Sequence, residues 1–243
     1  MVSFIVPVYN KADGLTGDVT ALHHFLSSEL GGSYEIILSD DGSTDGSPEI
    51  GRRLEKTLPS LRAVGYPENR GRGYAVKFAG KKCSGDRIIY LDLDFPRTTS
   101  LGRLLEMKAR LEKNPVVIGS RFLPDSRTRR IRLRNIVGKS FRSIVRLCLP
   151  GLRVSDPDVG FKGFDRDFFL KMTEVSRQDR WSWDLEALVI ARRNGFAIDA
   201  FPIDWDERHA GYSTSVNLFR DAVEEFRGLL QIRRTLKKGL YDF

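Results

Sequence analysis

Two aspartates separated by one residue, Asp92 and Asp94, follow the apolar run 87–91. Carboxylate oxygens suit hard cations such as Mg²⁺ or Mn²⁺, and a site with two carboxylates leaves positions open for water and phosphate oxygens. Because open α/β sheets bind ligands at the carboxyl ends of their strands, this pair is the first candidate for a metal site. Taken alone, an Asp-x-Asp pair is also a common solvated turn.

Two further polar segments follow expected strands. Asp40 and Asp41 open the run Asp-Asp-Gly-Ser-Thr-Asp-Gly-Ser, and a carboxylate at a strand tip can accept hydrogen bonds from a base N–H or a ribose hydroxyl. Asn69, Gly71 and Gly73 precede or open the next helix, where glycines allow close backbone approach and the helix N-terminus attracts anions. A plain turn and a plain helix start remain the alternatives for these segments.

Apolar runs of strand length alternate with helix-like stretches over the first 120 residues. The expected strands are 3–8, 34–39, 62–66, 87–91 and 116–118, and the expected helices are 16–30, 47–58, 74–83 and 101–113. This alternation predicts an α/β fold with a central, mostly parallel sheet flanked by helices. Later elements are expected at 183–194, 197–203 and 216–238. No segment has linker-like composition, so we expect one domain over 1–243, whose half 121–243 completes the site begun by 1–120.

The chain of 243 residues has 40 Lys and Arg against 32 Asp and Glu, a net charge of +8. This charge predicts an anionic partner, either nucleic acid, an acidic lipid surface or a phosphorylated substrate. We expect no nucleic-acid binding, because zinc fingers, ribonucleoprotein motifs and basic stretches interleaved with aromatics are missing. Cys83 and Cys148 show neither metal nor disulfide spacing and predict reduced thiols in the cytoplasm. We expect no transmembrane helix and no signal peptide.

Residues 126–155 contain nine basic residues and no acid. A helix is expected over 134–149, with Lys139, Arg142 and Arg146 on one arc and apolar side chains on the other. Such a helix fits an anionic membrane surface, and packing on the core with a solvated basic face is the alternative. The apolar stripe of the expected helix 216–238 indicates core packing, with a membrane or dimer contact as the alternative.

The motifs of the first half, read in chain order, resemble glycosyltransferase family 2. They are Pro7-Val-Tyr9-Asn10, Asp40-Asp41-Gly-Ser-Thr-Asp-Gly, Asn69-x-Gly71-x-Gly73, Asp92-x-Asp94 and Gly-Ser-Arg121. That family has the GT-A fold and uses nucleotide-diphosphate sugars with inversion. The resemblance implies a nucleotide-sugar pocket formed by Pro7, Tyr9, Asn10, Asp40, Asp41, Asn69, Gly71, Gly73 and Asp92. It also implies that Asp92 and Asp94 hold Mg²⁺ or Mn²⁺, a Lewis acid for the departing nucleotide.

The motifs of the second half resemble the polyprenyl-phosphate branch, which includes dolichol-phosphate mannosyl- and glucosyltransferases. They are Asp156-x-x-x-Gly-Phe-Lys162-x-Phe, Trp183-Asp184-x-Glu186, Trp205-x-Glu207 and Arg208-x-x-Gly-x-Ser213, and they lean toward the glucosyl members. The resemblance implies that Arg121, Arg134 and Ser213 meet the acceptor phosphate and that Arg208 holds the donor diphosphate. Arginine suits both tasks, because its planar fork binds phosphate bidentately. Two positions depart from the pattern. Pro96 replaces a Gln or Ser of the metal shell, and Thr214 replaces a Lys.

The expected reaction is transfer of a hexose from a UDP-glucose or GDP-mannose type donor to a polyprenyl or dolichyl phosphate at the cytoplasmic membrane face. A phosphate monoester has a second pKa of ~6 and arrives ionised, so it needs no general base. Asp184 is therefore expected to support the site, and a helix N-terminal acid favoured by the dipole is the alternative. The alternative function is a family 2 enzyme that extends a glycan. A membrane-spanning partner or a homo-oligomer stays open.

Overall fold

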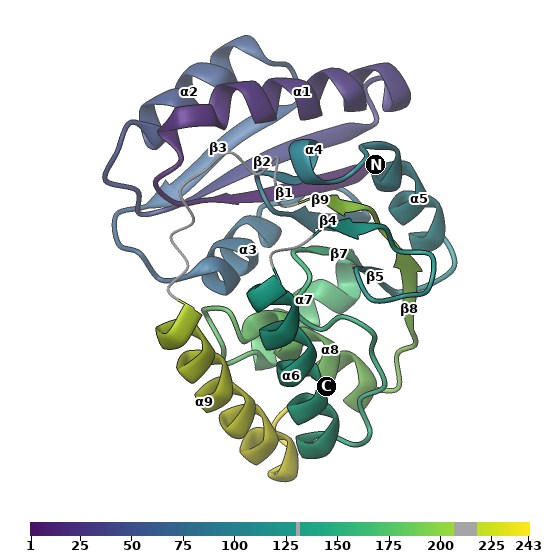
Figure 1. Cartoon of the computed structure of the whole chain (residues 1–243). Coiled ribbons are helices and arrows are strands. Elements are labelled where there is room, and N and C mark those ends of the chain that lie inside the picture. Colours follow the sequence, from purple (N-terminus) through teal and green to yellow (C-terminus); the bar gives the residue numbers. More distant parts are fainter. Residues whose placement is uncertain (130–131, 207–217) are drawn as a thin grey trace.

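The computed structural model describes residues 1–129, 132–206 and 218–243, with side chains for all of these except 132–135 and 218–221. A seven-stranded sheet runs through the molecule in the order β3-β2-β1-β4-β7-β5-β8 (Figure 1). Its strands are β1 (Val2–Val8), β2 (Tyr34–Asp41), β3 (Leu61–Tyr66), β4 (Arg87–Leu91), β5 (Val116–Ser120), β7 (Phe161–Asp165) and β8 (Ile198–Pro202). All neighbours pair in parallel except β7, which runs antiparallel to both β4 and β5.

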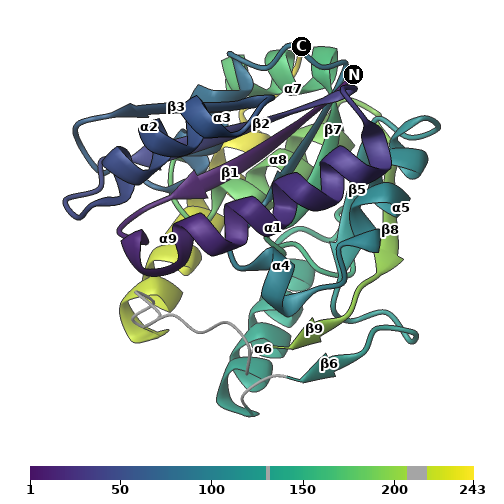
Figure 2. The same cartoon turned by 90° about the horizontal axis from the view of Figure 1, so that it is seen from above.

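Helices cover both faces of this sheet. They are α1 (Ala12–Leu30), α2 (Ser47–Thr57), α3 (Arg72–Gly80), α4 (Phe95–Thr98), α5 (Gly102–Leu111), α6 (Arg132–Cys148), α7 (Arg166–Val175), α8 (Trp183–Arg193) and α9 (Leu218–Lys237). Figure 1 shows α1 and α2 on one side of the sheet and α3, α7 and α8 on the other. Figure 2 shows α6 at one end of the molecule, beside a small ribbon of β6 (Thr128–Arg129) and β9 (Trp205–Asp206). None of the helices in the described residues is long and apolar enough to span a bilayer.

The predicted α/β fold with a mostly parallel sheet is confirmed. The strand β4 has the predicted bounds, and the other expected strands of the first half differ from the structure by one or two residues at their ends. The sequence analysis did not predict β7 and α7. β7 carries the buried sequence Phe-Lys-Gly-Phe before Asp165, so it lacks the alternation of polar and apolar side chains that marks a strand. Asp165 then caps α7 by accepting hydrogen bonds from the amides of Asp167 and Phe168.

The sheet places the polar segments of the sequence together. β1, β2 and β4 are neighbours and run in the same direction, so the loops that follow them leave from the same edge of the sheet. Their interiors are fully buried at Phe4, Ile36 and Ile89, which fixes these strand ends in the core. The edge formed by their carboxyl ends is therefore the candidate site.

Candidate active site

The strand β4 delivers Asp92 and Asp94 to this edge. The amide of Asp92 donates to the carbonyl of Gly160 (3.0 Å), and Asp94 precedes α4, whose Arg97 amide donates to the Asp94 carbonyl (3.0 Å). Arg97 is itself held by the buried Asp18 of α1, with N···O distances of 2.5 and 2.8 Å. The short helix α4 is thus anchored to α1, and the backbone of Asp94 is anchored with it.

The carboxylates of Asp92 and Asp94 are half-buried and repel each other. Burial, and then the charge of Asp92, raises the pKa of Asp94 to about 7. A bound cation would remove this penalty, and the hard oxygens fit Mg²⁺ or Mn²⁺. No group of three or more His, Cys, Asp or Glu side chains that could hold a metal occurs in the described residues. Two carboxylates would therefore leave the remaining positions to water and phosphate oxygens, as Mg²⁺ prefers. Pro96 lies in the first turn of α4 and offers no ligand.

Gly160 packs directly against Asp92. A Cβ atom added to Gly160 would lie 1.9 Å from Oδ2 of Asp92, which no real contact allows. The glycine of the Gly-Phe-Lys motif therefore leaves the space that the Asp92 carboxylate occupies. The next residue, Phe161, begins β7 and pairs with Leu91 at the end of β4.

Asp184 lies in a buried network of charges behind the two aspartates. It is fully buried and accepts hydrogen bonds from Lys162 Nζ (2.6 Å), from the Tyr90 hydroxyl (3.0 Å) and from the Arg72 guanidinium. Arg72 also contacts Oδ1 of Asp92 (3.3 Å). Burial raises the pKa of the Tyr90 hydroxyl, with the charge of Asp184 acting in the same direction, so this group remains a donor. The network joins α3, β4, β7 and α8 directly behind Asp92.

Lys162 and Arg72 are functional candidates that the sequence analysis did not assign. Lys162 is fully buried in β7, and burial lowers its pKa although Asp184 opposes the shift. A charge in a buried strand requires a partner. A lysine between Phe161 and Phe164 was therefore the feature of the sequence that could have indicated a buried ion pair at this position. Arg72 gave no such signal, because its partners come from β4 and α8, which are distant in the sequence.

The acids at the end of β2 have different surroundings. Asp41 is buried and accepts hydrogen bonds from Tyr66, Asn69 and the amides of residues 70 and 71 at 2.7–2.9 Å, with a further Gly71 contact of 3.1 Å. Its oxygens are thus committed to the loop before α3, where Gly71 has a φ of +106°. Gly73 lets this helix start pack on α8, because a Cβ there would lie 2.3 Å from Cβ of Trp183.

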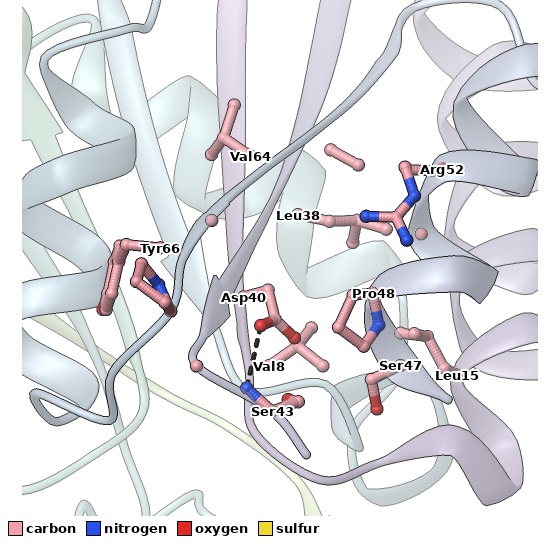
Figure 3. Close-up of a pocket in the computed structure, with 15 residues that line it drawn as sticks. Val8, Leu15, Leu38, Asp40, Ser43, Ser47, Pro48, Arg52, Val64 and Tyr66 are labelled. Atoms are coloured by element: carbon pink, nitrogen blue, oxygen red, sulfur yellow. Dashed lines mark hydrogen bonds between the residues drawn. The ribbon is translucent and has the colours of Figure 1, made fainter. Parts of the chain in front are cut away.

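Asp40 faces a cavity of about 350 Å³ (Figure 3). Its Oδ1 accepts a hydrogen bond from the amide of Ser43 (2.9 Å), whereas its Oδ2 is buried and has no hydrogen-bond partner in the described structure. Apolar side chains, among them Val8, Leu38 and Val64, line the cavity. Ser43, Ser47 and Arg52 line it as well. A carboxylate oxygen without a partner beside such a cavity can accept a hydrogen bond from a ligand N–H.

The end of β1 borders the same region. Pro7 belongs to β1, and Tyr9 follows the strand with 37% of its surface exposed. The side-chain oxygen of Asn10 accepts a hydrogen bond from the backbone amide of Thr44 (2.8 Å), and the backbone amide of Asn10 donates to Ser43 Oγ (2.9 Å). Asn10 thus ties the loop after β1 to the loop that carries Asp40.

In the second half, Arg121 follows β5 and pairs with the fully buried Asp156. Its Nε and Nη2 donate to the two carboxylate oxygens at 2.7 and 2.8 Å. Burial alone would raise the pKa of Asp156, but the charge and hydrogen bonds of Arg121 hold this pKa below its usual value. The edge of the Arg121 guanidinium formed by Nε and Nη2 is thus committed to a carboxylate and not to phosphate. Arg208, Ser213 and the side chain of Arg134 lie outside the described residues.

The helix α6 does not turn all its basic residues to solvent. Arg142 lies over the ring of Phe122, with its Cζ 4.2 Å from the ring centroid, and donates to the carbonyl of Ser155 (3.2 Å). Val145 is buried, whereas Ile136 and Leu147 are exposed by 62% and 81%. The helix therefore packs on the core along one face and presents apolar side chains on another.

With this geometry established, the chain can be compared with known proteins. Residues 3–172 match the model of glycosyl transferase family 2. The chain belongs to this family. It is 33% identical over 225 residues to glycosyltransferase AglD of Haloferax volcanii, a match that covers 91% of the chain and 35% of AglD. It is 32% identical over 249 residues to a dolichyl-phosphate beta-glucosyltransferase of Dictyostelium discoideum, covering 95% of the chain and 75% of that protein. The chain thus spans about a third of AglD and three quarters of the Dictyostelium protein.

A solved structure confirms the predicted GT-A fold. Glucosyl-3-phosphoglycerate synthase of Mycobacterium tuberculosis, crystallised with Mn²⁺, UDP and phosphoglyceric acid, superposes with a TM-score of 0.70 at 19% identity. The match covers 96% of this chain and 78% of that chain.

Proposed function

We propose that this family 2 glycosyltransferase moves glucose from UDP-glucose to the phosphate of a polyprenyl or dolichyl phosphate, with inversion at the anomeric carbon. The surroundings of Asp184 carry this proposal. This acid accepts hydrogen bonds from Lys162, Tyr90 and Arg72 and is fully buried, so it is poorly placed to take a proton from an acceptor. An acceptor that arrives ionised, with a second pKa of ~6, needs no such base.

The relatives support the same acceptor and sugar. Dolichyl-phosphate beta-glucosyltransferases of Dictyostelium discoideum and Saccharomyces cerevisiae are 32% and 26% identical to the chain over nearly its whole length. In the proposed reaction a phosphate oxygen of the lipid forms a bond to C1 of glucose while the bond from C1 to the β-phosphate of UDP breaks. The products are UDP and a lipid-linked glucosyl phosphate, and no proton has to be transferred.

The cavity at Asp40 supports uracil as the base. Oδ1 of Asp40 already accepts a hydrogen bond from the amide of Ser43, so we propose Oδ2, which has no partner in the described structure, as the oxygen that meets a ligand N–H. Uracil presents one ring N–H, whereas the edge of guanine presents a ring N–H and an amino group side by side, which a carboxylate meets with both oxygens. We propose that Pro7 and Tyr9 border the nucleotide, and that Asn10, Asp41, Asn69, Gly71 and Gly73 shape the loops around it.

We propose that Asp92 and Asp94 hold a divalent cation, Mg²⁺ or Mn²⁺. When bound, the ion supplies positive charge to the diphosphate that leaves. Arg72 keeps a further positive charge beside Asp92, where negative charge develops as UDP departs. Asp184 holds Arg72 and Lys162 in place, and Arg208 is proposed at the donor diphosphate.

We also propose that α6 meets an anionic membrane surface, where the acceptor lipid resides. The helix exposes Ile136 and Leu147 within a segment that has no acid between residues 126 and 155. It contacts α9, on which Phe226 is 44% exposed whereas Leu229 is buried. Exposed apolar side chains among basic ones suit the boundary between headgroups and acyl chains.

Transfer of radiolabelled sugar to a short-chain polyprenyl phosphate tests the proposal. UDP-glucose, UDP-N-acetylglucosamine and GDP-mannose are compared with Mg²⁺, with Mn²⁺ and with chelator. We expect transfer from UDP-glucose, lost on chelation. Transfer to a sugar hydroxyl without transfer to polyprenyl phosphate would instead establish the glycan-extending function.

A further inference from the structure

We infer that Arg142, on the inner side of α6, selects a phosphate monoester as acceptor by completing an anion site with Arg121 around the ring of Phe122. This inference rests on the proposed function, because it names the residue that reads the phosphate of the proposed acceptor. The sequence placed Arg142 on the outer basic face of the helix, and the structure turns it inward.

The two guanidinium groups converge on one aromatic ring. The Cζ atom of Arg142 lies 4.2 Å from the centroid of Phe122, and that of Arg121 lies 5.8 Å from it. Nη1 of Arg142 donates to the carbonyl of Ser155, the residue before Asp156. A guanidinium stacked on a ring keeps its edge N–H groups free for a planar or tetrahedral oxyanion. The arrangement joins α6 to the loop that follows β5.

Arg121 is paired with a carboxylate at this place, and the charge of Asp158 acts on it as well. Arg121 is neutralised by Asp156, whose two oxygens accept its Nε, its Nη2 and its amide (3.0 Å). No carboxylate of the described residues lies within ion-pair distance of Arg142, although the charge of Asp156 acts on it. A phosphate monoester beside this pair would therefore meet the guanidinium of Arg142 and those N–H groups of Arg121 that do not bond Asp156.

Two buried donors without partners belong to residues that contact these guanidinium groups. Nε1 of Trp205 and Oγ of Ser155 are both buried and have no hydrogen-bond partner in the described structure. The Trp205 ring lies 5.6 Å from the guanidinium of Arg121, and Ser155 already contacts Arg142 through its carbonyl. The oxygens of Asp156 are occupied by Arg121. A ligand rich in acceptors matches this set, and an alcohol does not.

Steady-state kinetics with farnesyl monophosphate, a water-soluble acceptor, test the inference. Arg142→Gln is expected to raise the KM for farnesyl monophosphate by at least about tenfold and to leave the KM for UDP-glucose unchanged. The KM of Arg142→Lys for farnesyl monophosphate should lie between those of the wild type and Arg142→Gln, because an ammonium group keeps the charge but lacks the planar, bidentate geometry of a guanidinium. The matched control is Arg153→Gln, which removes an exposed arginine of the same basic segment and should change neither constant.

Direct binding separates this inference from the proposed function. Titration of the metal-loaded protein with farnesyl monophosphate, farnesol and inorganic phosphate, followed by calorimetry, should show binding of the monophosphate that Arg142→Gln weakens. Weak binding of inorganic phosphate that also depends on Arg142 would identify a general phosphate site. If the wild type transfers no sugar but binds the monophosphate through Arg142, the proposed function fails and the anion site stands.

Two results would overturn the inference. One is an acceptor KM in Arg142→Gln equal to that of Arg153→Gln, with a lowered melting temperature, which would make Arg142 only a tie between α6 and Ser155. The other is equal binding of farnesol and farnesyl monophosphate, because a site for a phosphate must reject the alcohol.

Discussion

The donor side of the site, defined by Asp40, Asp41, Asp92 and Asp94, is built on the ends of parallel strands. Its acceptor side, defined by Arg121, Phe122 and Arg142, is carried by a loop and by α6. On the donor side the acids are fixed by backbone amides and by the buried network around Asp184. On the acceptor side Arg121 joins the loop after β5 to Asp156 in the loop before β7, and Arg142 joins α6 to Ser155 in that second loop. The helix α6 exposes Leu147 by 81%.

This difference has a consequence for substitutions. A change on the donor side disturbs several elements at once, because Asp184 alone joins α3, β4, β7 and α8. A change on the acceptor side disturbs contacts between two loops and α6, outside the strands of the sheet. We therefore expect large effects on turnover from the donor side, and smaller effects, confined to acceptor or membrane binding, from the acceptor side.

The largest effect is expected for Asp94→Asn. The variant removes a carboxylate that we propose holds the metal, so kcat should fall by at least about 10²-fold, and Mn²⁺ binding measured by electron paramagnetic resonance should weaken. Asp125→Asn, which changes an exposed acid, is the control and should behave like the wild type. A well-folded Asp94→Asn protein with full turnover would break the proposed role of the donor side.

Gly160→Ala is expected to have the next largest effect. Its Cβ would meet Asp92 Oδ2 at 1.9 Å, so either β7 or Asp92 must move. Overpacking of this kind costs ~1–3 kcal/mol, and we expect a loss of that size in the free energy of unfolding measured in urea, together with lower turnover. Gly151→Ala is matched to it, because a Cβ at Gly151 meets nothing within 4 Å. Equal stability of the two variants would show that the Asp92 contact tolerates the added atom.

The pH dependence of stability gives a finer test of the same acids. In the metal-free protein the pKa of Asp94 is about 7, against 3.8 for the unperturbed group. The folded state therefore holds a proton that the unfolded state releases, and stability is lost as the pH rises between these values. The Asp94→Asn protein lacks this loss.

Urea unfolding at a series of pH values, with chelator present, measures the effect. The variant should gain stability relative to the wild type as the pH rises from about 4 to about 7, and the gain should be constant above that range. A gain in stability that does not vary with pH would mean that burial and the charge of Asp92 do not raise the pKa of Asp94. On the acceptor side the sign is opposite, because Arg121 holds the pKa of the buried Asp156 below its usual value, and the stability that this pair contributes is lost as the pH falls.

The donor side was also the side that the sequence predicted better. Its acids stand directly after apolar runs, and parallel strands bring such positions to one edge of the sheet. Asp40, Asp92 and Asp94 could thus be placed from local pattern alone. The hydrogen bonds that commit Asp41 to the loop before α3 could not, because their donors come from another strand and loop.

The acceptor side depends on contacts that local pattern does not carry. β7 enters the sheet between β4 and β5, although it follows α6 in the chain, and its buried Lys162 conceals it from a search for alternating polarity. Arg142 has helical spacing with Lys139 and Arg146, so periodicity assigns all of them to one face. Only the position of Phe122, set by the loop after β5, shows that Arg142 turns inward.

The smallest effect on the folded enzyme is expected for Leu147→Ser, at the end of α6. Because Leu147 is 81% exposed, the free energy of unfolding should change by less than ~0.5 kcal/mol, and turnover of a water-soluble acceptor should be unchanged. Sedimentation with anionic vesicles should show weaker binding, by about tenfold or more, because burying a leucine side chain is worth roughly 1.5–3 kcal/mol. Leu240→Ser, at a residue 44% exposed and outside α6, is the control. If both variants bind vesicles like the wild type, α6 is a core-packed helix with a solvated face. The contrast between the two sides would then rest on Arg142 alone.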